Sequence, residues 1–312
     1  MIAAGHLESS RMRPVFEWNL GNRSLELGKR TLLMGVINVT PDSFSDGGQF
    51  LDRDKAIDLG ERLVNEGADI LDIGGESTRP GARVGAHMST TSKSSVYVTA
   101  EEELKRVLPV LAALKKRFPA AVLSIDTYKA AVARAAVGAG AQIVNDVSGL
   151  RWDPQMPKAL HDLKCGIVLM HMRGRPEEWQ NLPPAGDVVL LVKRELKDWA
   201  EKAVLAGIRR ERIVLDPGFG FGKSFDENYP LISRFSELQS AGFPLLAGTS
   251  RKSFIGRTLA RDAKDAPPDA RLYGTLATEV ALILKGAQII RTHDVKAAAE
   301  AARIADRILK AG

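Results

Sequence analysis

The chain has 312 residues, of which 45% are hydrophobic and 26% charged, a balance that excludes a disordered or fibrous protein. Its single cysteine, Cys165, excludes an intramolecular disulfide and a cysteine-built zinc site, and it fits a reducing compartment. The net charge of +6 permits nucleic acid or an anionic small molecule as partner, but basic residues spread along the chain and only 6% aromatic residues favour a solvated basic surface without nucleic acid.

Residues 1–14 are expected to form a loose N-terminal segment. They are too polar for the apolar core of a signal peptide, and no apolar run of the chain approaches the ~18 residues of a membrane span. We therefore expect a cytoplasmic protein without a membrane partner. Beyond this segment, apolar residues alternate with polar ones on both sides of Gly21-Asn22, which predicts a β-hairpin. The alternating residues are Phe16, Trp18, Leu20, Leu25 and Leu27.

Short apolar runs then alternate with longer helical patterns to the end of the chain. The predicted strands are Leu32–Ile37, Asp69–Ile73, Val122–Ile125, Gln142–Val144, Ile167–Met170, Ile213–Leu215, Pro244–Ala247 and Gln288–Ile290. The predicted helices are Lys55–Glu66, Glu101–Arg117, Lys129–Gly138, Gln155–Leu163, Val188–Ala206, Asn228–Ser240, Gly274–Lys285 and Lys296–Lys310. Several helical patterns end in Gly-Ala just before the next strand, because glycine accepts the left-handed conformation of a helix C-cap.

Eight strand–helix pairs predict an α/β fold, specifically a (β/α)8 TIM barrel preceded by the hairpin. Eight pairs close such a barrel, and ~250 residues is its usual size. An open doubly wound sheet is the alternative, but it would more often carry a glycine-rich dinucleotide turn after the first strand, and this chain has none. We expect residues 15–312 to form a single domain.

One long segment, Arg83–Ala100, interrupts the alternation between the second predicted strand and its helix. It is rich in Ser and Thr. Structureless segments of this length inside compact domains are usually functional or disordered. The edge of a mobile lid and a neutral insertion are both open readings.

Polar or glycine-rich residues follow every predicted strand, at the barrel end that carries the active site in this fold. These segments are Asn38–Gly48, Gly74–Gly81, Asp126-Thr127, Asn145-Asp146, Met170–Met172, Asp216–Lys223, Gly248–Ser253 and Arg291–Asp294. Single residues carry little weight, since Asp294 is also a good helix N-cap and His171 is as consistent with a structural histidine. The convergence of eight such strand ends predicts one pocket.

Two chemical ends are expected in this pocket. Asp126, Asn145 and Asp216 offer acceptors and an amide, which suit a flat heterocycle with several N–H donors if the aspartates are ionised. Lys252 is placed to meet a ring carbonyl or nitrogen of the same molecule.

The second end is cationic and suits phosphate. Arg291, His293, Ser253 and Arg79 lie at strand ends, and cations and amides near the last two strands of a barrel form a common phosphate site. Asn38 can hold a magnesium ion shared with those phosphates. Ordinary ion pairing remains the alternative for Arg79 and Arg291.

At seven motifs the sequence resembles the dihydropteroate synthases of folate biosynthesis. The motifs run in order and as a set are highly specific: MGVINVTPDSFSDGG (34–48), GGESTRPG (74–81), SIDT (124–127), NDVSG (145–149), DPGFGFG (216–222), SRKSF (250–254) and RTHDV (291–295). The resemblance implies a pterin-binding barrel, a transferase that condenses para-aminobenzoate with 6-hydroxymethyl-7,8-dihydropterin diphosphate. The products are 7,8-dihydropteroate and diphosphate, with Mg²⁺ as cofactor and a homodimer formed through the late helices.

The resemblance also assigns roles to individual residues. The pterin ligands and apolar walls are Asp126, Asn145, Met170, Asp216, Phe221 and Lys252. The diphosphate site, with Asn38 also at the metal, consists of Asn38, Thr78, Arg79, Arg291 and His293. The para-aminobenzoate pocket includes Phe44, Pro80 and Ser253. Loops after the first two strands are expected to close over the site, bringing Asp46 into a catalytic set with Asp126, Asp216 and Lys252.

The implied reaction agrees with these residue types. An arylamine is a poor nucleophile, so we expect the carbon–oxygen bond to loosen first and a pterin-stabilised cation to develop. Carboxylates at Asp126, Asp216 and Asp46 would stabilise that cation, while Arg291, His293 and magnesium would stabilise the diphosphate. No residue has to become a covalent nucleophile.

The chain departs from the family pattern around Gly85–Tyr97, where the link to the Glu101 helix is extended. This departure concerns the second loop and sulfonamide sensitivity but leaves the pterin ligands intact. Two other functions stay open on the residues alone. A methyltetrahydrofolate-binding methyltransferase barrel would share the Asp/Asn pocket but not need the SFSDGG and SRKS runs. A catalytically silent scaffold has only the basic charge in its favour.

Overall fold

The computed structural model describes residues 13–40, 49–76 and 98–311. Eight parallel strands form one sheet in the order β8-β7-β6-β5-β4-β3-β10-β9. They are β3 (Leu32–Asn38), β4 (Ile70–Gly74), β5 (Val122–Asp126), β6 (Ile143–Asp146), β7 (Gly166–Met170), β8 (Ile213–Asp216), β9 (Leu246–Ala247) and β10 (Ile289–Thr292). A parallel bridge between Leu215 and Leu245 joins the two ends of this order. The predicted TIM barrel is therefore confirmed.

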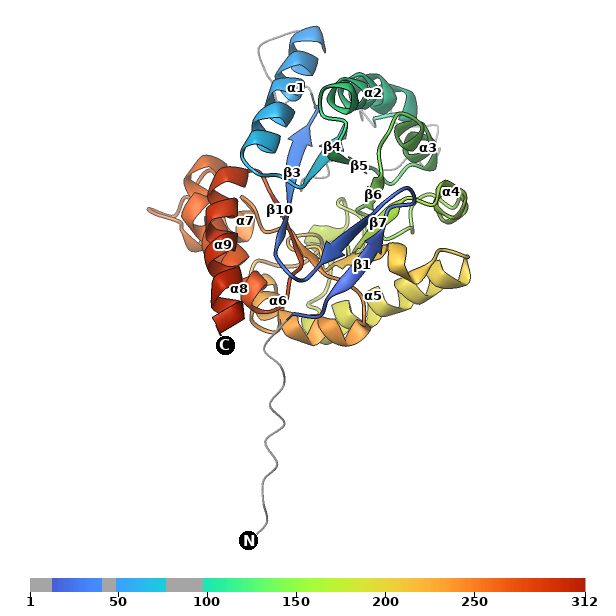
Figure 1. The fold of residues 1–312 in the computed structure, drawn as a ribbon. Coiled ribbons are helices and arrows are strands. Elements are labelled where there is room, and N and C mark those ends of the chain that lie inside the picture. The colour runs from blue at the N-terminus through green and yellow to red at the C-terminus, as the bar shows by residue number, and fades with distance from the viewer. Residues whose placement is uncertain (1–12, 41–48, 77–97, 312) are drawn as a thin grey trace, which may run out of the picture.

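Helices surround the strands on the outside of the barrel (Figure 1). They are α1 (Gln49–Asn65), α2 (Ala100–Arg117), α3 (Ala130–Gly138), α4 (Met156–Leu163), α5 (Val188–Leu205), α6 (Asn228–Ser233), α7 (Ser253–Thr258), α8 (Leu272–Leu284) and α9 (Val295–Ala311). Short 3-10 helices cover Trp179–Asn181, Arg210–Arg212, Phe235–Ala241 and Pro268–Arg271. Among the described helices, none is both long enough and apolar enough to span a membrane.

The helices of the structure depart from the prediction in three places. Helix α1 begins at Gln49 and not at the predicted Lys55. The pattern over 228–240 predicts one helix, but α6 ends at Ser233 and a 3-10 helix follows. Phe235 and Leu238 are buried, so packing of that segment sets its conformation more strongly than helical periodicity does. The six-residue helix α7 is not predicted, because a segment of this length shows too few turns for a periodic pattern.

The barrel interior changes character along its axis. Strand side chains alternate between the inside and the helices. Near the strand starts the inward residues form an apolar layer of Leu32, Met34, Ile70, Val122, Ile143, Val168, Val214, Leu246 and Ile289. One step further along four of the strands the inward positions are polar, namely Asp72, Ser124, Asn145 and Asp216, and all four are buried. A dry floor therefore lies beneath a polar chamber.

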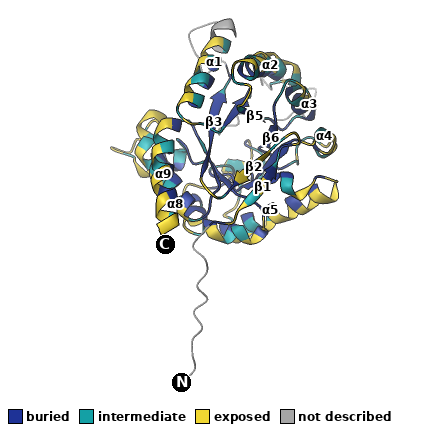
Figure 2. Cartoon of the chain, viewed as in Figure 1, coloured by how far each residue is buried: buried dark blue, intermediate teal, exposed yellow. Residues whose placement is uncertain are grey.

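The predicted hairpin packs against the apolar end of the barrel. It consists of β1 (Phe16–Asn19) paired antiparallel with β2 (Ser24–Leu27). Trp18 is fully buried in the apolar layer, and its indole N–H donates to the carbonyl oxygen of Arg212 at 2.8 Å. Figure 2 shows the strands in the colour of buried residues and the outer faces of the helices in that of exposed ones. The hairpin therefore closes the end opposite the predicted pocket.

Arg13, within the segment 1–14 that is expected to be loose, is buried beside the C-terminal helix. Its guanidinium donates to the Ala287 carbonyl oxygen at 2.7 Å and to Asp306 Oδ1 at 2.7 Å. Thr31 also accepts from Arg13, at 2.8 Å. The described chain thus begins with a residue that ties the start of the hairpin to α9.

Candidate active site

A cavity of about 430 Å³ opens at the carboxyl ends of the strands. Every described residue among the predicted site residues lines it: Asn38, Asp126, Asn145, Met170, Asp216, Phe221, Lys252, Ser253, Arg291 and His293. The other predicted residues, Phe44, Asp46, Thr78, Arg79 and Pro80, lie outside the described residues. The ten described residues come from seven of the eight strands and the loops that follow them, and they meet in one place.

Carboxylates and one guanidinium cross the centre of the chamber. Arg291 on β10 donates to Asp126 Oδ2 at 2.8 Å and to Asp72 Oδ2 at 2.7 Å, and Asn145 Nδ2 donates to the same Asp72 oxygen at 3.0 Å. Burial raises the pKa of Asp126 to about 7, against the opposing charge of Arg291. Arg291, expected at the phosphate end, therefore also contacts the carboxylate end.

Three buried side-chain oxygens in this chamber have no hydrogen-bond partner among the described residues: Oδ1 of Asn145, Oδ1 of Asp72 and Oγ of Ser124. Of these residues, Asn145 lines the cavity. A buried acceptor without a donor costs about 1–3 kcal/mol. The acceptor set of the chamber therefore matches a ligand that brings several N–H groups.

The glycine-rich turn after β8 forms the opposite wall. Asp216 Oδ1 accepts from the backbone N–H of Gly218 at 2.7 Å, and burial raises the pKa of Asp216 to about 6 although Gly218 and Lys252 oppose the rise. The Lys252 ammonium lies 3.8 Å from the centroid of the Phe221 ring. Trp179 packs its ring edge-on against Phe221 with centroids 5.8 Å apart. An aromatic and cationic wall therefore faces the carboxylates.

The last two strands supply a neutral histidine beside cationic side chains. His293 contacts Ser250 Oγ through both its backbone N–H, at 3.1 Å, and its ring Nδ1, at 3.0 Å. Burial, followed by the charges of Arg291 and Arg251, lowers the pKa of His293 to about 3. His293 is therefore uncharged at neutral pH and acts here as a hydrogen-bonding group, while the positive charge comes from the arginines and Lys252.

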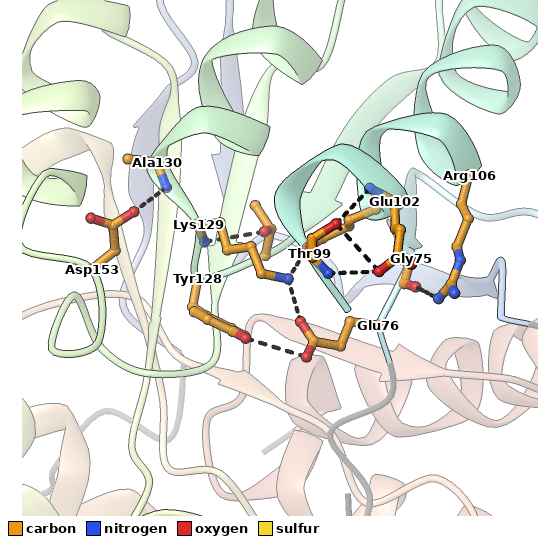
Figure 3. Close-up of polar contacts among 11 residues, drawn as sticks. Gly75, Glu76, Thr99, Glu102, Arg106, Tyr128, Lys129, Ala130 and Asp153 are labelled. Atoms are coloured by element: carbon orange, nitrogen blue, oxygen red, sulfur yellow. Dashed lines mark hydrogen bonds and ion pairs between the residues drawn. The ribbon is translucent and has the colours of Figure 1, made fainter. Parts of the chain in front are cut away.

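Glu76, directly after β4, lines the cavity from the β4–β5 side and is not among the predicted site residues (Figure 3). Its Oε1 accepts from the Tyr128 hydroxyl at 3.2 Å and its Oε2 from Lys129 Nζ at 2.5 Å. Lys129 also bonds to Glu103 on α2. Burial raises the pKa of Glu76, and the charge of Lys129 opposes the rise. A cation between two carboxylates thus fixes this edge of the cavity to α2 and α3.

Other residues that matter here carried only weak signals in the sequence. Asp72 is a charged residue inside an otherwise apolar parallel strand, which is unusual for a side chain that is fully buried. Lys223 and His171 stand within strand-end segments that the sequence singles out, but nothing there indicates that they touch. In the described ranges 13–40, 49–76 and 98–311, no group of three His, Cys, Asp or Glu side chains is arranged to hold a metal ion.

Comparison with known proteins gives relatives over nearly the whole chain. The family described as pterin binding enzyme matches residues 34–293. A dihydropteroate synthase of Synechocystis sp. is 42% identical over 289 residues, which cover 93% of this chain and 94% of the relative. The dihydropteroate synthase of Escherichia coli is 42% identical over 279 residues, covering 89% and 92%.

Solved structures give the same result. A Yersinia pestis dihydropteroate synthase in complex with a sulfonamide drug superposes with a TM-score of 0.83 at 40% identity, covering 95% of this chain and 100% of the other. A Xanthomonas albilineans enzyme solved with 4-aminobenzoic acid gives 0.82 at 41% identity, covering 95% and 98%. The same enzyme in complex with 7,8-dihydropteroate gives 0.79 at 40%, covering 94% and 98%. The chain belongs to the dihydropteroate synthase family of pterin-binding enzymes.

Proposed function

We propose that residues 15–312 act as one pterin-binding unit whose cavity condenses para-aminobenzoate with 6-hydroxymethyl-7,8-dihydropterin diphosphate. The products are 7,8-dihydropteroate and diphosphate. The observation that carries the proposal is the convergence of the ten described site residues on a single cavity at the carboxyl end of the barrel. The activity of the relatives and the chemistry of the cavity agree on this reaction.

The pterin ring occupies the chamber between the carboxylates and the aromatic wall. Asp126, Asn145 and Asp216 accept hydrogen bonds from its N–H groups, and Lys252 donates to a ring carbonyl or nitrogen. Met170 and Phe221 cover the faces of the ring. Unpartnered acceptors in the chamber and the apolar floor beneath it support this placement.

The diphosphate lies toward β3 and β10. Arg291 binds its negative charge and His293 donates a hydrogen bond, with Thr78 and Arg79 as further ligands from outside the described residues. Magnesium bound together with substrate phosphates takes only one or two protein ligands, usually carboxylates, and keeps several waters. The Asn38 amide oxygen at the cavity can supply one such oxygen, and the described residues offer no separate all-protein metal cage. When bound, magnesium offsets the charge of the departing diphosphate.

Charge stabilisation carries the reaction. As the carbon–oxygen bond to the diphosphate lengthens, positive charge develops on the pterin and the carboxylates of Asp126 and Asp216 stabilise it. Asp46 joins them from outside the described residues. The arylamine then attacks from the side of Ser253, with Phe44 and Pro80 completing its pocket. The carbon–nitrogen bond forms as the bond to the diphosphate oxygen breaks, and the amine gives up one N–H proton to solvent. Because both pKa values are raised, to about 7 and about 6, we expect activity to rise between pH 5 and pH 8 as both aspartates ionise.

A homodimer through α8 and α9 completes the proposal, in a cytoplasmic protein. These two helices pack side by side, and large apolar side chains on them are exposed: Tyr273 by 83%, Ile304 by 65% and Ile308 by 52%. Such side chains favour a second copy of the chain as the partner. Light scattering on Ile304→Glu/Ile308→Glu should give a monomer where the unmodified protein gives a dimer, and a monomer in both cases would contradict this assembly.

The decisive experiment measures diphosphate release from the pterin diphosphate with Mg²⁺, with and without para-aminobenzoate. We expect release that depends on the arylamine and yields dihydropteroate. Asp126→Asn should abolish turnover while the far-UV circular dichroism stays unchanged. Normal turnover in that variant would contradict charge stabilisation, whereas binding of a methylated folate without any turnover would favour a methyl-transfer barrel.

A further inference from the structure

A buried lysine, Lys223, lies behind the pterin wall. It is 8% exposed, and its ammonium donates to the carbonyl oxygens of Gly218 at 2.8 Å and of Phe221 at 3.1 Å. Its third short contact, at 3.0 Å, is with Nδ1 of His171. Burial lowers the pKa of Lys223 to about 7, and the charge of Asp216 opposes this shift. The protonated ammonium has three N–H donors and no acceptor, so these three contacts use all of them, while the His171 carbonyl oxygen is a longer neighbour at 3.4 Å. One side chain thus ties both ends of the turn 218–221 to the end of β7.

The neighbours of His171 fix the position of its ring proton. Its Nε2 lies 3.0 Å from Oε2 of Glu195 on α5, and a carboxylate oxygen only accepts, so Nε2 carries the proton and donates it. Nδ1 of His171 is then an acceptor for the protonated Lys223. Burial and the charge of Lys223 lower the pKa of His171 to about 3, so the ring stays neutral. The three side chains form a directed series from Glu195 near the surface to the turn.

The turn contains glycines at positions where the neighbouring main chain leaves no room for a side chain. Gly218 and Gly222 have φ values of +63° and +65°, and a Cβ atom on them would lie 1.9 Å from the carbonyl oxygen of His171 and 2.2 Å from that of Arg173. Main chain therefore packs directly against main chain. Such close packing excludes water from the carbonyls of the turn, and buried carbonyls without a donor are costly. Lys223 supplies that donor.

The turn is also part of the site. The Gly218 N–H that binds Asp216 and the Phe221 ring beside Lys252 both belong to it. A shift of the turn would move the Asp216 carboxylate and the aromatic wall together. Lys223 is not among the residues that line the cavity, so it acts through these neighbours.

We propose that Lys223 is a positioning residue for the pterin half of the site, held in place by Glu195 through neutral His171. The proposal rests on the proposed function, because it assigns this turn to the pterin substrate. The proposal predicts different effects on the binding of the two substrates. Loss of the ammonium should weaken binding of the pterin diphosphate and leave binding of para-aminobenzoate nearly unchanged, because none of the residues proposed for the arylamine pocket belongs to the turn 218–221.

The test compares Lys223→Met with the unmodified protein, measuring kcat and the KM of each substrate separately. We expect the KM for the pterin diphosphate to rise about tenfold or more, as for the loss of a buried charged hydrogen bond, and the KM for para-aminobenzoate to stay within about twofold. Equal changes in both KM values, or none, would overturn the proposal. An unmodified protein without turnover would instead refute the proposed function, so the two failures are distinguishable.

A second pair of variants covers the case in which Lys223→Met does not fold. Glu195→Ala removes the acceptor at the outer end of the series and should raise the KM for the pterin diphosphate roughly threefold. Glu195→Gln keeps an acceptor oxygen for His171 and should restore most of the affinity. Glu201→Gln, on the exposed face of the same helix, is the matched control without effect. Failure of Glu195→Gln to restore what Glu195→Ala loses would contradict the role of the series.

Discussion

Two lysines support two sides of the cavity, separated by β6, by different chemistry. On the β4–β5 side, Lys129 lies between the carboxylates of Glu76 and Glu103, whose side chains are 6% and 1% exposed. On the β7–β8 side, Lys223 meets backbone carbonyls and the neutral His171. Lys129 thus links two carboxylate side chains to each other, whereas Lys223 links the His171 side chain to the main chain of the turn 218–221.

Glycines on the two sides show the same contrast. A Cβ atom on Gly75 would meet side-chain atoms of two buried residues, Cγ1 of Val107 at 2.8 Å and Cγ of Glu103 at 3.0 Å, and the backbone oxygen of Glu103 only at 3.3 Å, so repacking of side chains relieves the contact. A Cβ atom on Gly218 would meet a backbone oxygen at 1.9 Å, at a φ of +63° that side chains rarely accept. The β4–β5 side can therefore adapt to a change by moving side chains. The β7–β8 side can only move its backbone.

The largest effect is expected from Lys129→Met. It leaves two buried carboxylates without their cation, and breaking a buried ion pair in this way destabilises a protein by about 3–5 kcal/mol. Lys129 holds down a pKa of Glu76 that burial raises, so the variant raises this pKa further. A carboxyl with a raised folded-state pKa costs stability above that pKa and none at low pH. The deficit should therefore be full at neutral pH and shrink as the pH falls toward the usual range of glutamate.

Urea unfolding across this pH range measures the deficit. Adding Glu103→Gln to Lys129→Met removes one of the two stranded charges and should recover part of the loss at neutral pH. A deficit that is independent of pH would mean that the apolar part of the lysine, and not its charge, supports the β4–β5 side.

A matched pair of glycine variants tests the second half of the comparison. Gly218→Ala should destabilise the protein by about 2–4 kcal/mol, because the left-handed conformation is strained for alanine and the turn must also move. Gly75→Ala should cost about 1 kcal/mol, the lower range for overpacking against movable side chains. Unfolding by urea gives both values. Gly138→Ala, whose Cβ meets nothing within 4 Å, is the control, and equal losses at Gly75 and Gly218 would remove the distinction between the two sides.

Local sequence patterns were sufficient for most of the fold. The hairpin around Gly21-Asn22 and all eight barrel strands are found within one or two residues of their predicted positions. Apolar runs of this kind are buried on both faces, and several follow a glycine that ends the preceding helix. Each strand can therefore be predicted from its own local sequence. The break between α6 and the 3-10 helix at Phe235 was not predictable in this way, because it depends on packing against other elements.

The site likewise contains features that the local sequence predicts and features that depend on contacts between distant elements. The residues at the strand ends were predictable because the fold itself brings those ends together, and the ten that the structure describes line one cavity. The hydrogen bonds and ion pairs that these residues and their neighbours form with each other were not predictable. Arg291 and Asp72 are 219 positions apart, and Lys223 and His171 are 52 apart. Only the register of the barrel places these partners opposite each other, so chemistry between strands stays hidden in a single sequence.

The smallest expected effect concerns how a helix begins on each side. On the β4–β5 side, Thr99 caps α2 by accepting from Glu102 N at 3.1 Å, while Glu102 Oε2 accepts from Thr99 N at 2.9 Å. Loss of such a cap in Thr99→Ala should cost about 1 kcal/mol in urea unfolding, and Thr99→Ser should restore it, because the same oxygen is kept.

On the β7–β8 side, Asp187 caps α5 by accepting from Val189 N at 3.0 Å and Leu190 N at 3.1 Å, and it also pairs with Arg234 at 3.0 Å. Asp187→Asn keeps a capping oxygen but loses the charge at the helix N-terminus. We therefore expect a small loss at low salt that disappears at high salt, since screening removes only the electrostatic part. The Thr99→Ala loss should be the same at both salt concentrations. If both variants respond to salt in the same way, the two helix caps do not differ in their electrostatic contribution. The difference between the β4–β5 and β7–β8 sides would then be confined to the residues around the cavity.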